Sequence, residues 1–507
     1  MTNTDRLQGS DGWTFSSTST LGGDRVLTRH VDHSTHVRRV QSLVHDWNPQ
    51  WGTKAAWQDA IDWALMADLD GLVTTLATVY APRLGRPATD PVALLRSLSL
   101  MNLLQEASIT RFVRRLHQSP VLSYLCGFPG PDAVPAVSTF YAFLSRLYPE
   151  PVRRKGCMRR SSGRRLKLKS GEKMPTRRPG AIGRVARRVL REAHKPPRTR
   201  ASAVWDRLLA LVTLESVRKD VLPSRWDLAV DSTPVQSGAH SFGKKTCDCP
   251  SRRCDCLRYF SDPMALLGWD SHRHRYYFGY SPQAMVVANP GPDGKSHPLI
   301  VSLALHPANR HDGAAYPDLL VKTQQLYAGA GPILDRVIGD AAFDVSDLWE
   351  FTKARGLTPV FAPMTEIHPP RLSDAATEAG MHLDPDYRPV CKEGRSLASR
   401  GHARPGLKGW ACPVRNKKSP PCLTPCAKVN KTVYVNFRGS RYDAIGLPYR
   451  SDAWTQVYNQ RTGVERAFSL LESSGVKDAH HRRPYLWFGR LALAAIVSHV
   501  KAWLRQL

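Results

Sequence analysis

Three acidic residues that lie far apart along the chain have the type and local setting for divalent-cation chemistry. Asp231 ends the apolar run WDLAVD and Asp340 ends the run RVIGD, so both are expected at the ends of buried strands, where a sheet exposes functional groups. Glu465 belongs to a helical pattern that can cover the same sheet. Converging carboxylates repel one another unless a cation stands between them, and hard oxygen ligands suit Mg²⁺ or Mn²⁺. Two such ions about 3.5–4 Å apart can activate a hydroxyl on one side of a phosphorus atom and stabilise the leaving oxygen on the other.

Other assignments of these residues remain open from the sequence. Asp231 and Asp340 can equally be turn formers. Asp227 faces the same side of its strand as Asp231 and is an alternative metal ligand. Asp231 is the favoured ligand because it stands at the end of the strand. Asp344 is an alternative to Asp340, although capping of the next helix accounts better for it. The motif HPANRHDG offers four more groups, which either surround the metal or hold a turn: His306, Asn309, His311 and Asp312.

The segment around Glu465 predicts one helix that begins near Asp452. Tyr458, Arg461, Glu465 and Glu472 fall at i, i+3, i+7 and i+14, so they share one face beside an apolar stripe. Such a helix can pack on a sheet and present a Tyr-Arg-Glu ridge at the edge of the packed surface.

Cysteines form two groups that suggest metal binding more than disulfides in a reducing compartment. Cys247, Cys249, Cys254 and Cys256 lie within CDCPSRRCDC and can hold one structural Zn²⁺, although their one-residue gaps are shorter than the usual two to four. The second group can bind Zn²⁺ or remain as reduced thiols; its members are Cys391, Cys412, Cys422 and Cys426.

The charge balance indicates a polyanionic partner. Lys and Arg number 72 and Asp and Glu 43 among 507 residues, a formal net charge of +29. Nucleic acid is the expected partner, and an anionic membrane surface is the rival. No apolar run approaches the roughly 18 residues that a bilayer crossing needs, and the N-terminus lacks a signal-peptide pattern. A cytoplasmic, nucleoid-associated protein with no membrane segment is therefore expected.

The chain divides into five predicted regions. Residues 1–150 are helical, with starts at Asp90 and Ser108, and form a DNA-binding or dimerisation domain. Residues 151–200 carry nineteen Lys or Arg from position 153 onward against two acids, which predicts a flexible arm that binds phosphates and buries no core. Residues 201–363 alternate strands and helices, 364–450 form a Cys-, Pro- and Gly-rich insertion containing the strand KTVYVNF, and 451–507 are helical.

The predicted fold class is α/β, with helices packed on a mixed sheet. Its strands are expected in the segments WDLAVD, YYFGYSPQAMVVAN, HPLIVSLALH, RVIGD and TPVFAP.

The sequence resembles the DDE transposases of bacterial insertion sequences. The resemblance rests on LAVDSTPV around Asp231, HPANRHDG at 306–313 and VIGDAAFD around Asp340. It rests above all on YNQRTGVERAF at 458–468, which is similar to the family's Tyr-x2-Arg-x3-Glu-x6-Lys signature. Residues 87–147 are similar to the helical domain that precedes the catalytic domain in many of these enzymes, whereas 1–86 and 151–200 match nothing recognised.

The resemblance implies a ribonuclease-H-like catalytic domain, with Asp231 on the first strand, Asp340 after the fourth and Glu465 on a late helix beyond an insertion. These three residues would hold two Mg²⁺ or Mn²⁺ ions, and Tyr458 and Arg461 would bind phosphates of the transposon end. The activity would be cleavage at transposon ends and joining of 3′-hydroxyls to target DNA, by a homodimer on paired ends.

One residue departs from the signature. The Lys position, seven residues after Glu465, is occupied by Glu472, and the nearest Lys is Lys477. An acid there would repel DNA phosphate, which favours an alternative: a catalytically decayed or repurposed DNA-binding protein. A ribonuclease-H-like nuclease without strand joining is a third possibility.

Overall fold

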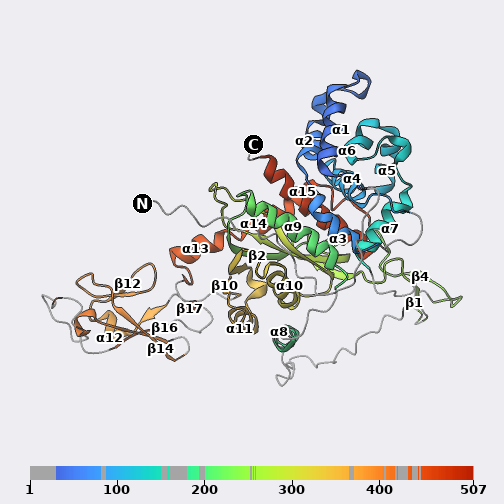
Figure 1. Cartoon of the computed structure of the whole chain (residues 1–507). Helices are drawn as coiled ribbons and strands as arrows, with labels where there is room; N and C mark the ends of the chain where they lie inside the picture. The colour runs from blue at the N-terminus through green and yellow to red at the C-terminus, as the bar shows by residue number, and fades with distance from the viewer. Residues whose placement is uncertain are drawn as a thin grey trace, which may run out of the picture.

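The computed structural model describes residues 30–80, 87–149, 157–158, 180–192, 200–251, 254, 256, 258–364, 370–404, 407–416, 420, 432–436, 443–444 and 447–505. Figure 1 shows a helical N-terminal region in blue and cyan, a central sheet surrounded by helices, and a separate β-rich part in orange. The predicted mixed α/β class with a helical N-terminal region is therefore confirmed. No helix among the described residues is long and apolar enough to span a membrane.

A mixed sheet forms the centre of the molecule. Its long strands lie in the order β10 (Thr358–Phe361), β9 (Ile333–Gly339), β2 (Arg225–Ser232), β7 (Arg275–Val287) and β8 (Ile300–Pro307). The strands β10, β9 and β2 are parallel, whereas β7 is antiparallel to β2 and β8 is antiparallel to β7. Two short strands, β3 (Val235–Gln236) and β6 (Leu266–Asp270), pair with the first half of β7. All five predicted strand segments are found in this sheet.

Helices cover the sheet, as the burial of successive residues in its strands indicates. In β2 the five residues from Trp226 to Val230 are all buried, which requires cover on both faces. The cover includes α10 (Asp312–Tyr327), which packs on β7 and β8, and α14 (Thr462–Ser473), which packs on β2 and β7. The other helices near the sheet are α9 (Ala203–Arg218), α11 (Ser346–Ala354) and α13 (Asp452–Asn459).

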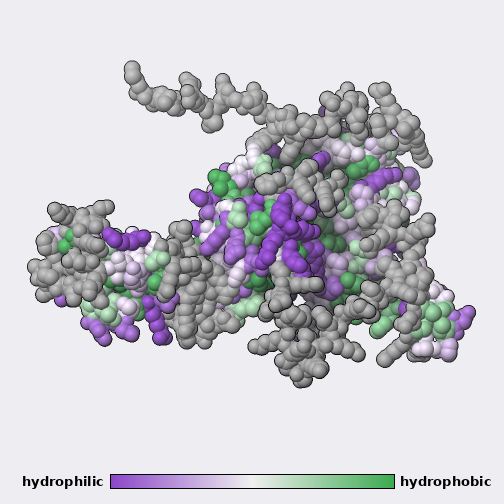
Figure 2. All heavy atoms as spheres, turned by 90° about the horizontal axis from the view of Figure 1, so that it is seen from below, coloured by the Kyte–Doolittle hydropathy of each residue, from purple (hydrophilic) through white to green (hydrophobic). Residues whose placement is uncertain are grey.

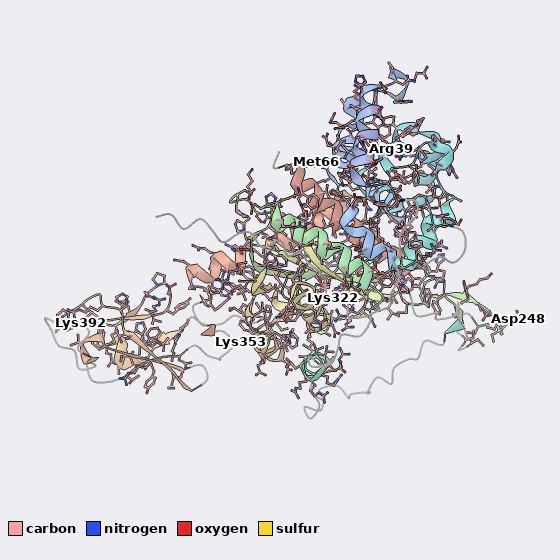
Figure 3. All side chains as sticks on the ribbon, viewed as in Figure 1. Arg39, Met66, Asp248, Lys322, Lys353 and Lys392 are labelled. Carbon is pink, nitrogen blue, oxygen red and sulfur yellow. The ribbon has the colours of Figure 1, made fainter. Side chains whose placement is uncertain are left out.

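A buried ion pair fixes α10 against α9. Lys322 Nζ lies 2.8 Å from Asp206 Oδ1, and each side chain is 6% exposed. Lys322 also donates to the carbonyl oxygen of Leu303 on β8. Figure 3 shows Lys322 in the middle of the main body. Removal of one partner would leave a buried charge uncompensated, at a cost of about 3–5 kcal/mol.

The N-terminal helices begin where their caps predict. Asp90 accepts from Val92 N at 2.9 Å, and Ser108 accepts from Arg111 N at 3.3 Å, so both predicted starts are confirmed. The region comprises α1 (His33–His45), α2 (Gln58–Met66), α3 (Val73–Ala77), α4 (Pro91–Leu103), α5 (Ile109–Gln118), α6 (Pro120–Cys126) and α7 (Val137–Leu147).

The last helix joins this region to the sheet. α15 (Pro484–Leu504) packs on α4, α7 and α2 on one side and on α9 and β8 on the other. Its Arg490 is 2% exposed and donates to the carbonyl oxygens of Glu106, at 2.7 Å, and Ser474, at 3.1 Å. One helix therefore shares its apolar surface between the N-terminal helices and the central sheet, in a single continuous core.

The insertion has a core of its own. Four strands lie in the order β11 (Arg371–Leu372), β16 (Val433–Asn436), β15 (Leu407–Ala411) and β14 (Ala398–Arg404), and β16 is the strand predicted from KTVYVNF. The remaining short elements are α12 (Asp374–Thr377), β12 (His382–Leu383), β13 (Pro389–Val390), β17 (Asp443–Ala444) and β18 (Leu447–Pro448). A hydrophobic cluster that includes Trp410, Met381 and Val435 is separate from the main core.

Part of the basic segment differs from the expected flexible arm. Residues Ala181–Glu192 form α8, which packs on α10 and α11 and buries Gly183, Ala186 and Val189 at intervals of three residues. Gly183 and Ala186 are small, so the apolar face of α8 is not evident in a sequence dominated by arginines. The charge of the segment therefore led to the prediction that it packs on nothing. Figure 1 places α8 below the sheet, and Figure 2, seen from below, shows hydrophilic side chains gathered over the centre of that face. The exposed arginines of α8 are Arg184, Arg187, Arg188 and Arg191.

Substitution of Gly183 should detach α8 from the body. A Cβ atom at this position would lie 2.2 Å from Asp347 Oδ2 on α11, and the clash is with a side chain that also pairs with Arg187. Gly183→Leu should therefore raise hydrogen exchange in 181–192 at least tenfold, since overpacking typically costs about 1–3 kcal/mol. Gly180→Ala is the control, because no atom lies within 4 Å of its Cβ position. Unchanged exchange in the Leu variant would contradict this packing.

Candidate active site

The pairing of β2 with β9 brings Asp231 and Asp340 to the same edge of the sheet. The parallel register aligns Leu228 with Val337 and Ala229 with Ile338. Asp231 and Asp340 each lie two residues beyond that second pair, so they stand at equivalent positions at the carboxyl ends of neighbouring strands. Asp340 also begins a short turn, since its Oδ1 accepts from Ala342 N at 2.9 Å.

Glu465 reaches the same edge through Arg461. The Arg461 guanidinium lies 2.5 Å from Glu465 Oε1 and 3.8 Å from Asp231 Oδ2. Burial raises the pKa of Tyr458, the neighbouring Arg461 opposes this rise, and the charges of Asp340 and Glu465 add to it, so Tyr458 lies near the same groups. Asp231 comes from β2, Asp340 directly follows β9, and the other three predicted site residues lie on α13, α14 and the turn between them, so all five lie around one edge of the sheet.

The helix that carries these residues is interrupted, contrary to the prediction of one continuous helix. It forms α13 and α14, with a turn at Gln460 and Arg461 between them. The local sequence NQRTG contains Asn, Thr and Gly, which are weak helix formers, and Thr462 Oγ1 donates to the carbonyl oxygen of Asn459 at 3.0 Å. The interruption places Arg461 at the N-cap of α14, four residues before Glu465.

The charges at this edge shift the ionisation of Asp231. The pKa of Asp231 is raised from 3.8 to about 7, chiefly by burial and also by the carboxylates of Asp340 and Asp312. A backbone hydrogen bond from Ser232 and the charge of Arg461 oppose the rise. The edge therefore concentrates negative charge that Arg461 compensates only in part.

Asp312 is a site residue whose role the sequence left open. It begins α10, and its Oδ1 accepts from Ser232 Oγ, next to Asp231, at 2.7 Å. Burial raises the pKa of Asp312, and Asp340 adds to the rise. Its motif neighbour His311 instead caps α10, accepting from Gly313 N at 3.1 Å. The motif therefore supplies both a turn and a fourth carboxylate.

The alternatives to Asp231 and Asp340 have other partners. Asp227 Oδ2 pairs with Arg336 Nη1 at 3.0 Å. The sequence suggested that Asp344 caps the helix α11, but it does not. Its carboxylate instead accepts from Trp349 Nε1 at 3.2 Å and from Met364 N at 2.8 Å. His306 is mostly buried, which lowers its pKa to about 3.

The donor set at this edge fits a hard divalent cation. Aspartate and glutamate oxygens are the ligands that Mg²⁺ and Mn²⁺ take, and a cation would relieve the repulsion that raises the pKa of Asp231. Among the described residues, the one group of three or more ligands whose atoms all lie within 4.8 Å is the first cysteine group. An ion shared by all three carboxylates therefore needs these side chains to move closer together, and Glu465, which is 52% exposed, would have to turn away from Arg461 to take part.

Cysteines of the two groups differ in what the structure describes. Sulfur atoms of Cys247, Cys249, Cys254 and Cys256 all lie within 4.8 Å of one another. In the second group Cys391 and Cys412 are buried in the insertion, and the other two lie outside the described residues.

Two family profiles match the chain. One, described as "Transposase DDE domain", matches residues 223–498, more than half of the 507 residues. The chain belongs to the DDE transposases. The second profile, "Transposase domain (DUF772)", matches residues 55–146, which hold α2 to α6 and nearly all of α7. No curated protein matches this transposase.

The matched DDE region runs from β2 into α15 and contains every residue of the site described above. It also contains Glu472, the residue that departs from the transposase signature. Glu472 forms an ion pair with Lys477 on the loop that follows α14, so a cation stands beside the acid.

The raised pKa of Asp231 predicts that this residue contributes less to the stability of the unliganded transposase as the pH rises. A carboxyl group with a pKa near 7 in the folded state and 3.8 unfolded binds its proton more tightly when folded, so its contribution falls between about pH 4 and pH 7. Because Asp231 is partly exposed, we expect its contribution to fall by about 1–2 kcal/mol, measured as the difference in unfolding free energy between the wild type and Asp231→Asn at both ends of this interval.

Asp231→Asn should gain stability relative to the wild type as the pH rises through this interval, since Asn does not titrate. Mg²⁺ should reduce the fall in the wild type and have less effect in the variant. Asp335→Asn, on β9 but paired with Arg225 at 3.0 Å, serves as the control. The same pH dependence in all three proteins would contradict the assignment.

Proposed function

We propose that this transposase cleaves DNA at transposon ends and joins the resulting 3′-hydroxyls to target DNA. The observation that carries the proposal is the convergence of Asp231, Asp340 and Glu465, with Arg461 in contact with two of them. Because joining needs two ends together, two chains are proposed to act as a homodimer on the paired ends.

Asp231, Asp340 and Glu465 are the proposed ligands of two Mg²⁺ or Mn²⁺ ions. Bound divalent ions supply activation of the attacking hydroxyl and stabilisation of the leaving oxygen. Asp312 lies where its carboxylate adds to the negative charge of the site, and its bond to Ser232 holds it beside Asp231. The side chains of this edge thus position the reacting phosphate without forming a covalent bond to DNA.

Tyr458 and Arg461 are the proposed contacts to transposon-end phosphates. Cations on Asp231 and Glu465 would compete with Arg461 for the same oxygens, and its guanidinium fork would then be free to take a phosphate in bidentate fashion. The Glu472–Lys477 pair supports retained function, because Lys477 offsets the acid at the signature's Lys position.

A ribonuclease-H-like architecture is proposed for the catalytic region. Its support is the order of the long strands, β8-β7-β2-β9-β10, with an antiparallel first half and a parallel second half. Asp231 lies on the first of these strands in the chain, and Asp340 follows the fourth. The helix that bears Glu465 comes after the insertion, as the family resemblance implies.

The β6–β7 hairpin is a proposed surface for DNA beyond the reacting phosphate. Ala284 of β7 pairs with Asp231, and the hairpin extends nine residues further, to Arg275, on the order of 30 Å of strand. Its turn, His272 to His274, is held by Asp270, which accepts from the amides of His272 and Arg273, both at 3.1 Å. The stem exposes Trp269 (51%) and Tyr276 (74%). A basic turn above exposed aromatic rings suits phosphates and unstacked bases.

A catalytically decayed or repurposed DNA-binding protein derived from a transposase is the second candidate, and Glu472 at the signature's Lys position is the observation that favours it. A strand-transfer assay with Mg²⁺ and the element's own ends separates the possibilities. Joined products support the transposase, binding alone supports a decayed DNA-binding protein, and cleavage without joining supports a nuclease.

Asp340→Asn should abolish cleavage and joining but leave DNA binding largely intact. The expected loss is at least about 100-fold, because loss of mere supporting contacts at metal sites already costs about 10–100-fold. The matched control is Asp335→Asn, a carboxylate near the start of β9, the strand that Asp340 follows. Full activity in the Asp340 variant would remove this residue from the catalytic set.

Neutralising the hairpin turn should weaken DNA binding and its salt dependence. Arg273→Ala combined with Arg275→Ala should reduce the slope of log affinity against log salt by about 2, since each phosphate contact contributes about 0.9. The control is Arg225→Ala, an exposed arginine at the start of β2, away from Asp231. Equal slopes in the double variant and the wild type would show that DNA does not contact the hairpin turn.

A further inference from the structure

The first cysteine group forms the end of a small β-hairpin. Strands β4 (Lys244–Lys245) and β5 (Arg258–Tyr259) pair antiparallel, with Lys244 opposite Tyr259. One Cys-x-Cys pair, Cys247 and Cys249, follows β4, and the other, Cys254 and Cys256, precedes β5. Figure 3 shows Asp248, within this loop, far out on one side of the main body.

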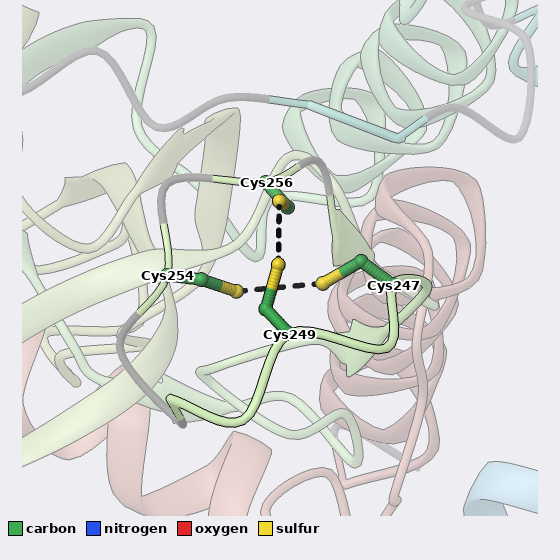
Figure 4. Close-up of side chains that lie close together, drawn as sticks. All are labelled: Cys247, Cys249, Cys254 and Cys256. Atoms are coloured by element: carbon green, nitrogen blue, oxygen red, sulfur yellow. Dashed lines mark hydrogen bonds between the residues drawn. The ribbon is translucent and has the colours of Figure 1, made fainter.

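The four sulfur atoms of this loop point toward one another. Cys247 Sγ lies 3.4 Å from Cys254 Sγ, and Cys249 Sγ lies 3.5 Å from Cys256 Sγ, as Figure 4 shows. All four lie within 4.8 Å of one another. Four thiolates bound about 2.3 Å from a tetrahedral Zn²⁺ would stand about 3.8 Å apart. The observed spacing is therefore close to that of a Zn(Cys)4 site.

Among the described residues, the hairpin has little apolar core to hold its shape. Each strand has two residues, and isolated two-stranded hairpins are marginal in water even when longer. Its apolar support from the described residues is small: Phe260 is buried, whereas Phe242 is 73% exposed. Small units with so little core usually need a metal or a covalent link.

The hairpin also provides an edge to which the basic segment is attached. Strand β1 (Cys157–Met158) pairs antiparallel with β5, with Cys157 opposite Tyr259 and Met158 opposite Arg258. These two residues lie near the start of the basic segment, whose later part forms α8. Figure 1 shows β1 in the same small sheet as β4, well away from α8. The segment is thus anchored at two separate points on the molecule.

We infer that Cys247, Cys249, Cys254 and Cys256 bind one structural Zn²⁺, and that this ion stabilises the hairpin edge on which the basic segment begins. The site is independent of the carboxylate edge and takes no part in the proposed reaction. Nearby Lys245, which donates to the carbonyl oxygen of Cys249, adds positive charge that favours thiolates.

Metal content of the full-length chain, purified under reducing conditions without chelator, tests the site. The double variant Cys247→Ser, Cys254→Ser should contain one zinc fewer per chain than the wild type, whatever the second cysteine group binds. Cys126→Ala is the control, because this buried thiol lies in the N-terminal helices. Equal zinc in the double variant and the wild type would overturn the site.

Two further measurements cover other outcomes. If the double variant does not fold, Co²⁺ added to zinc-stripped wild type should give the visible absorption of a tetrahedral thiolate complex; its absence would overturn the inference. Alkylation without reduction should find all four thiols free once the metal is removed. Recovery of Cys247–Cys254 and Cys249–Cys256 disulfides from freshly purified protein would overturn the zinc site and show that two disulfides hold the loop instead.

The anchoring role has its own readout. Hydrogen exchange at Cys157 and Met158 should rise at least tenfold in the double variant and remain unchanged in α8. Zinc loss without this rise would show that the ion stabilises only the cysteine loop and not the pairing of β1 with β5. It would overturn the inference that the ion supports the anchoring of the basic segment.

Discussion

The parallel register between β2 and β9 is the constraint on which the site depends. Side chains in a strand alternate with a period of two, so a slip by one residue would turn Asp231 or Asp340 to the opposite face. The register is held by packing on both sides, since Ala229 and Ile338, which pair directly, are fully buried. The apolar core therefore places two repelling carboxylates together, and folding must supply the energy that their proximity costs.

That energy comes from a core that spans most of the chain. α15 packs against the helices of the N-terminal region and against β8 at once, while Lys322 and Asp206 join α10 to α9 within the same interior. The helix bearing Glu465 is positioned by the same core, because Val464 and Phe468 are buried against it. The third carboxylate thus depends on contacts formed by residues from both ends of the protein.

Local patterns in the sequence predicted much of this arrangement, because they record local physics. The caps at Asp90 and Ser108 and the five buried strands follow from residue types within a few positions of each other. Asp312 could not be assigned in this way, since its neighbour Ser232 is eighty positions away. The packing of α8 was missed because Gly183 and Ala186 bury little apolar surface, and charge dominated the prediction. The turn at Gln460 and Arg461 was also missed, although Asn, Thr and Gly in NQRTG signal it.

The insertion between β10 and α13 has a consequence for protein synthesis. A ribosome completes the strands that carry two of the carboxylates long before it reaches the third, and an independently packed β unit is made in between. Nascent or prematurely terminated chains consequently lack both Glu465 and the helix that closes the core. On the proposed assignment, every product that ends before α14 therefore lacks the third carboxylate of the site.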